Sequence, residues 1–431
     1  NYQDDYYDWD ASYNFRDRDL LIAGPVARDM AANFAAFWQS PLSVPAERLG
    51  DVARFLQANG VPAPPHRPYR KPERVQALLA QVADETLIRA RFVEPALAVQ
   101  GVQFIGDLPD KHVDEVAESV QAGVVLQQLI ASARDEVLLQ TPYLVLSKPA
   151  QRLFRGLHRQ PDPPRVRVST NSLASTDAFI AYAISYKYKR RYLRDFGFEI
   201  HEFKPFPADA PFDAGPVGAD LDELPPPRPR QRRPTLRERR LAERGLRSAP
   251  VSEAGRSSPF ASPGGLPVRL KRAGLRMGLH AKSMVVDEAV GVVGTHNFDP
   301  RGDTLNTESA VVIADPAFAR ALAASIRGDM APGNAWTIGR RDSSPVLPGI
   351  EFTLARVSER MPIFDLWPVK YATSYEFVSG PDCPLPPPSP FDKDFRRCHT
   401  PVGDFPEVDL GLKWLGVRVF TAFGSGLSPI L

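Results

Sequence analysis

The sequence predicts an α/β protein in which a mixed or mostly parallel β-sheet is flanked by helices. Helical and strand patterns alternate between residues 113 and 203, which is the order that a sheet covered by crossover helices produces. Short apolar strand patterns return at residues 280–313. The length of 431 residues suffices for a sizeable core, and a hydrophobic content of 43% is normal for a globular protein.

Hydrophobic periodicity and capping residues place the individual elements. Val113, Val116, Val120 and Val124 recur at helical spacing and predict a helix that packs on the sheet. The expected helices are residues 25–38, pieces within 41–83, 113–134, 151–158, a helix from 176 or 177 to 194, and 316–326. The expected strands are residues 20–23, 102–105, 137–143, 166–170, 198–203, 280–287, 290–293 and 309–313.

A segment rich in Pro and Arg interrupts this alternation. Residues 205–270 contain few large apolar side chains and are expected to form a disordered or loosely attached insertion. Its Arg cluster, residues 228–247, could contact anionic lipid head groups or nucleic acid, and a solvated tether with no partner explains it equally well. The formal net charge of +2 creates no global field that demands nucleic acid.

Several features of the sequence bear on compartment and cofactors. The two cysteines, Cys383 and Cys398, are compatible with one disulfide or with two free thiols. No run of about 18 apolar residues predicts a transmembrane helix. Because the chain begins at Asn1 without an initiator Met, we expect an N-terminally incomplete sequence from which a signal or anchor could be missing. No Cys, His or carboxylate cluster has the spacing of metal ligands, so neither a metal nor a cofactor is expected.

The strongest chemical signal is a group of polar residues around three short strands in the second half. His280 and Lys282 are two positions apart, and such side chains lie on the same face of a strand. Asn297 follows the next strand, and Glu308 precedes the third. The strand ends could therefore bring an imidazole, an ammonium group, an amide and a carboxylate to one point. This set suits a phosphodiester, because Lys and Asn stabilise phosphoryl oxygens while His attacks phosphorus or protonates a leaving group.

The spacing of these residues resembles the signature of the phospholipase D superfamily, His-x-Lys-x4-Asp-x6-Gly-Ser-x-Asn followed by a later Glu. The corresponding residues here are His280, Lys282, Asp287, Gly294, Asn297 and Glu308, with Thr295 in place of Ser. Thr-Pro-Tyr at residues 141–143 and Thr-Asn-Ser-Leu at residues 170–173, each after a predicted strand, also resemble the second half of bacterial cardiolipin synthases.

The resemblance implies an α/β fold of two pseudo-repeated phospholipase D-type halves, each a mixed β-sheet flanked by helices. We expect the remainder of the first half at residues 1–110, the second half at 111–330, and a C-terminal tail or appendage at 331–431. The first His-x-Lys motif would then lie upstream of residue 1.

The resemblance also implies roles for individual residues. Asn1 would correspond to Asn297, and Asp19 to Glu308. His280 is expected to act as general acid and base. Lys282 and Asn297 are expected to bind the non-bridging phosphoryl oxygens. Glu308 is expected to orient an imidazole, with Asp19 as its catalytic counterpart in the first half. Substrate binding is assigned to Asn1, Thr295 and Asn171, and support of the turn to Asp287.

The expected function is phosphatidyl transfer or phospholipid hydrolysis through a phosphohistidine intermediate, as in cardiolipin synthases. Expected partners are a phospholipid substrate and a membrane surface, with no obligatory metal, and nucleic acid is not the expected partner. The expected location is peripheral, on the bacterial inner membrane. Two alternatives stay open, because fold resemblance does not fix the substrate. They are a nucleic-acid phosphodiesterase and a degenerate relative without catalysis.

Overall fold

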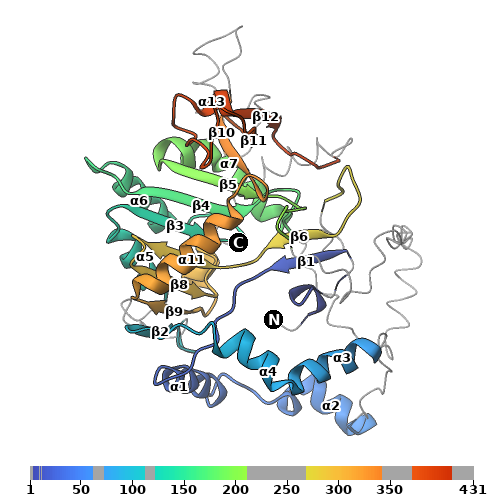
Figure 1. The fold of residues 1–431 in the computed structure, drawn as a ribbon. Coiled ribbons are helices and arrows are strands. Elements are labelled where there is room, and N and C mark those ends of the chain that lie inside the picture. Colours follow the sequence, from blue (N-terminus) through green and yellow to red (C-terminus); the bar gives the residue numbers. More distant parts are fainter. Residues whose placement is uncertain are drawn as a thin grey trace, which may run out of the picture.

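A mixed ten-stranded sheet flanked by helices forms the centre of the molecule in the computed structural model (Figure 1). The predicted α/β class is thereby confirmed. The structure describes residues 3–8, 10, 12–61, 72–111, 122–210, 268–341 and 371–409. Most of the predicted Pro- and Arg-rich insertion lies outside the described residues.

The strand order in the main sheet is β12-β11-β10-β5-β4-β3-β7-β8-β9-β2, and β1 and β6 form a second, two-stranded sheet. The strands are β1 (Tyr13–Arg16), β2 (Val102–Gly106), β3 (Glu136–Gln140), β4 (Arg165–Asn171), β5 (Phe198–Phe203), β6 (Arg276–Leu279), β7 (Ser283–Val286), β8 (Val290–Gly294), β9 (Ser309–Ile313), β10 (Ala335–Arg340), β11 (Ala372–Phe377) and β12 (His399–Gly403). The α-helices are α1 (Ala27–Trp38), α2 (Gly50–Asn59), α3 (Pro72–Ala83), α4 (Glu85–Ile88), α5 (Ala122–Ala131), α6 (Lys148–His158), α7 (Phe179–Asp195), α10 (Pro300–Thr304), α11 (Pro316–Asp329) and α13 (Phe395–Cys398).

The parallel strands β3, β4 and β5 are the buried centre of the sheet. Strands covered on both faces are apolar at successive positions rather than alternating, and Leu138 and Leu139 on β3 are both fully buried. Leu139 belongs to the core that includes Phe154 of α6, whereas Leu138 packs with Leu322 of α11. Helices therefore cover both faces of the central strands.

Side-chain caps explain where two of these helices begin. The Ser147 hydroxyl accepts a hydrogen bond from the Ala150 N–H at the start of α6. The Asp315 carboxylate accepts from the N–H groups of Ala317 and Phe318 at the start of α11. Both helices carry Pro in the first turn, where its missing N–H costs no hydrogen bond.

Two predicted strands differ from the structure. Residues 20–23 form no strand, and Leu21 is 80% exposed. Instead β1 forms earlier in the chain, where it pairs in parallel with β6. Of the predicted strand 280–287, residues 283–286 form β7, and residues 280–282 form no strand. At these three residues the chain passes from β6 in the small sheet to β7 in the main sheet. Of the predicted helix 113–134, the structure describes residues 122–131 as α5.

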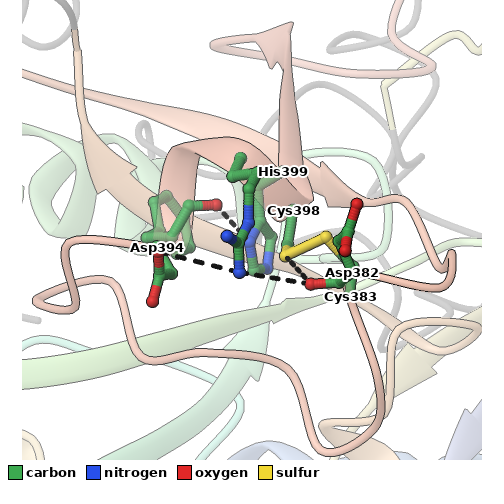
Figure 2. The surroundings of a disulfide bond; sticks show 7 residues. Asp382, Cys383, Asp394, Cys398 and His399 are labelled. Carbon is green, nitrogen blue, oxygen red and sulfur yellow. Dashed lines mark hydrogen bonds and ion pairs between the residues drawn. A yellow bond between two sulfur atoms is a disulfide. The ribbon is translucent and has the colours of Figure 1, made fainter.

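The described part of residues 331–431 joins the same sheet, since β10 pairs with β5, and β11 and β12 follow outward. Cys383 and Cys398 form a disulfide beside this edge (Figure 2), so the disulfide is the alternative that the structure adopts. The rings of Phe395 and His399 stack at a centroid distance of 4.0 Å next to it.

The predicted domain boundaries remain a prediction. None of the described helices combines the length and apolar character required to cross a membrane.

Candidate active site

The pairing of β1 with β6 brings two distant parts of the sequence together. Arg16 and Leu279 are partners in the parallel register, so the residues that follow them, Asp17 and His280, leave the small sheet side by side. The N–H of His280 donates to the carbonyl oxygen of Arg16 at 2.8 Å. The buried Asn171 amide holds the neighbouring backbone, because its Nδ2 donates to the Leu279 oxygen at 2.7 Å and its Oδ1 accepts from the Leu279 N–H at 2.8 Å.

A glycine permits this close approach of β1 to β6. A Cβ atom at Gly278 would lie 1.8 Å from the Tyr13 hydroxyl oxygen and 2.7 Å from the Ser175 carbonyl oxygen. The Tyr13 hydroxyl donates to that Ser175 oxygen at 2.8 Å. The glycine two residues before His280 is therefore required by packing.

The imidazole of His280 lies between a carboxylate and aromatic rings. Its Nδ1 is 2.6 Å from Asp17 Oδ2. The hydroxyl of Tyr6 is 3.5 Å from its Nε2, and the ring of Phe15 lies at a centroid distance of 5.1 Å. Burial raises the pKa of Tyr6 to about 12, and the charge of Asp17 acts in the same direction, so the Tyr6 hydroxyl keeps its proton at neutral pH. The carboxylate at Nδ1 fixes the orientation of the ring, so that Nε2 faces Tyr6 and Lys282.

The two arginines that flank Asp17 attach this segment to α11. Arg16 Nη1 donates to Asp329 Oδ1 at 2.6 Å, and Arg18 Nη2 donates to the Ser325 hydroxyl at 2.7 Å. Arg18 also lies 3.5 Å from Asp329. Asp329 is buried, and its contacts with both arginines hold the backbone on each side of Asp17.

Lys282 places a cation against the imidazole. The Nζ of Lys282 is 2.9 Å from each ring nitrogen of His280. The backbone carbonyl oxygen of Lys282 accepts a hydrogen bond from the Gly294 N–H at 3.0 Å. Burial lowers the pKa of Lys282 to about 8, against the opposing charges of Asp17 and other carboxylates. For Asp17 itself burial acts to raise the pKa, but the hydrogen bond from His280 and the positive charges outweigh it, and the pKa is lowered.

The ends of β8 and β9 supply the opposite wall. The Thr295 hydroxyl donates to Glu308 Oε2 at 2.5 Å and accepts from the Ser309 N–H at 3.0 Å. The Glu308 N–H donates to Asp107 Oδ2, whose carboxylate is paired with the buried Lys111 at 2.7 Å. This ion pair holds the loop before β9 in place.

Asn297 has an oxygen available for a ligand. Its backbone oxygen accepts from the Thr141 hydroxyl at 2.6 Å, which fixes the turn after β8. Its side-chain Oδ1 is buried and has no hydrogen-bond partner within the described parts of the chain. This oxygen is an acceptor, and the Nδ2 of the same amide is a donor, and Asn297 lines the cavity described below.

These groups surround one polar cavity of about 800 Å³. Its lining residues are Asp17, Arg18, Asp19, Asn33, Phe37, Asp107, His280, Lys282, Gly294, Thr295, Asn297, Leu305, Asn306, Thr307, Glu308 and Ser309. The arrangement combines a positioned imidazole, a cation, an amide and hydrogen-bonded carboxylates, which is a set that can stabilise phosphoryl oxygens and transfer a proton. No group of three or more potential metal-ligating side chains occurs within the described ranges.

The structure brings six of the predicted site residues together at this cavity: Asp19, His280, Lys282, Thr295, Asn297 and Glu308. Asn171, expected to bind substrate, is outside the lining and holds the Leu279 backbone instead. Asp287 lies at the far end of β7, where its carboxylate accepts from the N–H groups of residues 134–136. Asn1 lies outside the described residues.

Sequence reasoning missed Asp17 as the carboxylate that contacts His280. The sequence Arg16-Asp17-Arg18-Asp19 offers two acidic residues. A strand at residues 20–23 would select Asp19, whereas the strand that sets the position is β1. The aromatic residues Tyr13 and Phe15, alternating with Asn14, were the available signal for this strand.

The sequence is similar to a known protein family and to individual bacterial proteins. Residues 254–330 match the family described as cardiolipin synthase, PLD-like domain. Cardiolipin synthase C of Escherichia coli (strain K12) is 23% identical over 317 residues, which are 72% of this chain and 53% of that protein. An uncharacterized protein of Helicobacter pylori (strain J99) is 23% identical over 327 residues, which are 76% of this chain and 53% of that protein. The chain thus spans about half the length of the curated relatives it matches.

Two solved structures are similar to part of the chain at low identity. The phospholipase D family member Nuc from Salmonella typhimurium is 14% identical with a TM-score of 0.29, over 54% of this chain and 95% of that chain. Phosphatidylserine synthase from Haemophilus influenzae is 14% identical with a TM-score of 0.31, over 64% of this chain and 50% of that chain.

Proposed function

Because the chain belongs to the phospholipase D superfamily and is cardiolipin synthase-like, we propose that it catalyses displacement at the phosphorus of a phospholipid phosphodiester. The reaction is phosphatidyl transfer to an alcohol or hydrolysis by water. The observation that carries the proposal is the contact of His280 Nδ1 with Asp17 at 2.6 Å, with Lys282 beside the same ring, at a polar cavity lined by the motif residues.

Lys282 and Asn297 bind the non-bridging oxygens of the phosphodiester in this proposal. Charge accumulates on these oxygens during displacement, and donors that are already in place stabilise it without reorganisation. The Lys282 ammonium supplies a positive charge, and the Asn297 amide supplies a neutral donor. Thr295 contributes indirectly, because its hydroxyl holds Glu308 at the wall of the cavity.

His280 transfers the proton. As the bond between phosphorus and the leaving alkoxide breaks, Nε2 gives its proton to that oxygen, and Nδ1 remains hydrogen-bonded to Asp17. In the second step the neutral imidazole takes a proton from the acceptor alcohol or water, whose oxygen then attacks phosphorus. His280 is regenerated in its protonated form, so the protons balance over the two steps.

The attacking nucleophile is a second imidazole in the two-step reaction that the resemblance implies. It forms a phosphohistidine and is released when the acceptor attacks. Among the described residues that line the cavity, His280 is the one imidazole. The nucleophilic His is therefore assigned to a position outside that set.

Incubation with phosphatidylglycerol tests the proposal. Transfer converts two molecules into cardiolipin and glycerol, and hydrolysis gives phosphatidic acid and glycerol. Formation of either product, with none from the His280→Asn variant, supports the assignment. Cleavage of DNA without either lipid product would refute it in favour of a nuclease. Absence of turnover on both substrates would leave the non-catalytic alternative.

The substrate class places the protein at a membrane surface in this proposal, peripherally on the bacterial inner membrane. Flotation with phosphatidylglycerol vesicles tests this location directly. A chain that stays at the bottom of the gradient with such vesicles, and also with vesicles that contain cardiolipin, would contradict it.

A further inference from the structure

We propose that a second cavity, next to the catalytic one, binds an acyl chain of the phospholipid substrate, an inference that rests on the proposed function. The cavity has a volume of about 480 Å³, which is within the range of pockets that bind small molecules. It is lined by residues of α1, of β2 and the loop that follows it, and of α5. Strand β2 is an edge of the main sheet, and α1 lies beside it (Figure 1).

The lining of this cavity is mainly apolar, in contrast to the polar catalytic cavity. Its apolar residues are Ala32, Ala36, Phe104, Ile105, Leu108 and Val125. Asp29 and Gln103 add polar groups. An acyl chain gains free energy roughly in proportion to the apolar area removed from water, so this lining favours a hydrocarbon chain over a head group.

The two cavities share a wall. Asn33 lines both of them, and its Nδ2 donates to the carbonyl oxygen of Asp107, a residue of the catalytic cavity, at 3.1 Å. A Cβ atom at Gly106 would lie 2.7 Å from Asn33 Nδ2, so the absence of a side chain there permits this contact. On the same helix Phe37 lines the catalytic cavity and Ala36 lines the second one. A phosphodiester at His280 and its apolar chain would thus lie on opposite sides of Asn33.

Helix α1 also exposes large apolar side chains next to these positions. Phe34 and Trp38 are 64% and 75% exposed, and their rings stack at a centroid distance of 5.8 Å. They directly follow Asn33 and Phe37 in the sequence. Trp is enriched at the interface of a bilayer, and Phe and Trp occur on the apolar face of helices that lie there. A bilayer is the source of the acyl chain in this proposal.

The test compares two soluble phosphatidylglycerols, dibutyroyl and dihexanoyl, with the 431-residue chain and two variants. Ala36→Trp fills the acyl cavity. Ala31→Trp places the same side chain at an exposed position of α1 that lines neither cavity. Binding is measured by isothermal titration calorimetry and turnover by product analysis. We expect the wild type to bind the dihexanoyl lipid about tenfold more tightly, as two further methylene groups of one buried chain imply. Ala36→Trp loses this preference, and Ala31→Trp keeps it.

The binding and turnover results separate the two proposals. Equal affinity of the wild type for both lipids, or an unchanged preference in Ala36→Trp, would overturn the acyl cavity even if the protein turns over phosphatidylglycerol. A preference that Ala36→Trp abolishes, in a protein that releases no product, would support the acyl cavity and overturn the catalytic proposal.

Discussion

Replacement of Asp17 by Asn is the most direct test of the proposed site, because it removes a charge and keeps the shape of the side chain. Asp17 Oδ2 lies 2.6 Å from His280 Nδ1, and the two side chains are only 20% and 16% exposed. A hydrogen bond to a charged group in such surroundings contributes about 1.5–3 kcal/mol. If it is lost in the transition state, at about 1.4 kcal/mol per factor of ten, kcat falls about 10- to 150-fold.

Asp19→Asn is the matched comparison, since it makes the same chemical change two residues away at the same cavity. Asp19 is exposed, and a change in its charge is expected to alter kcat by less than about threefold, because exposed charges are screened by solvent. Initial rates of product formation from saturating phosphatidylglycerol give kcat, and circular dichroism melting checks that both variants are folded. A greater loss in Asp19→Asn than in Asp17→Asn would refute the assignment drawn from the structure and restore the one drawn from the sequence.

Three further predictions concern the same region. His280→Asn should abolish turnover and leave the melting temperature within a few degrees of the wild type; retained turnover would exclude His280 as the acid and base. Because the pKa of Lys282 is lowered to about 8, its charged form is lost as the pH rises through that value, so kcat should decline above about pH 8. Lys282→Arg keeps its charge to far higher pH, and persistence of the same alkaline decline in that variant would show that another group causes it. Gly278→Ala should destabilise the fold by about 1–3 kcal/mol, because its Cβ would overlap Tyr13, and an unchanged denaturation midpoint would contradict that packing.

Local sequence patterns predicted the elements whose environment is set by nearby residues. The strand at Ser309–Ile313 and the helix that ends at His158 follow from apolar periodicity and caps within a few residues of each. The fixed spacing from His280 to Glu308 predicted that these motif residues surround one cavity, because consecutive strands of a meander place their ends together.

Long-range contacts account for what the sequence did not predict. Which of two neighbouring carboxylates contacts His280 depends on the register of β1 with β6, and no local pattern encodes a parallel pairing between segments so far apart. The same holds for Asn171, whose type suggests a polar ligand contact but whose amide is used by the backbone of Leu279. Both cases concern polar side chains, whose possible partners are more numerous than those of apolar ones.

The separation of 263 residues between Asp17 and His280 has a consequence for how the protein gains and loses activity. Closing so long a loop is entropically costly and slow compared with forming local contacts. The small sheet that joins them is separate from the main one, so fraying of β1 would separate the two side chains and leave the ten-stranded sheet intact. Mild heating or limited proteolysis next to β1 should then inactivate the protein before it unfolds globally.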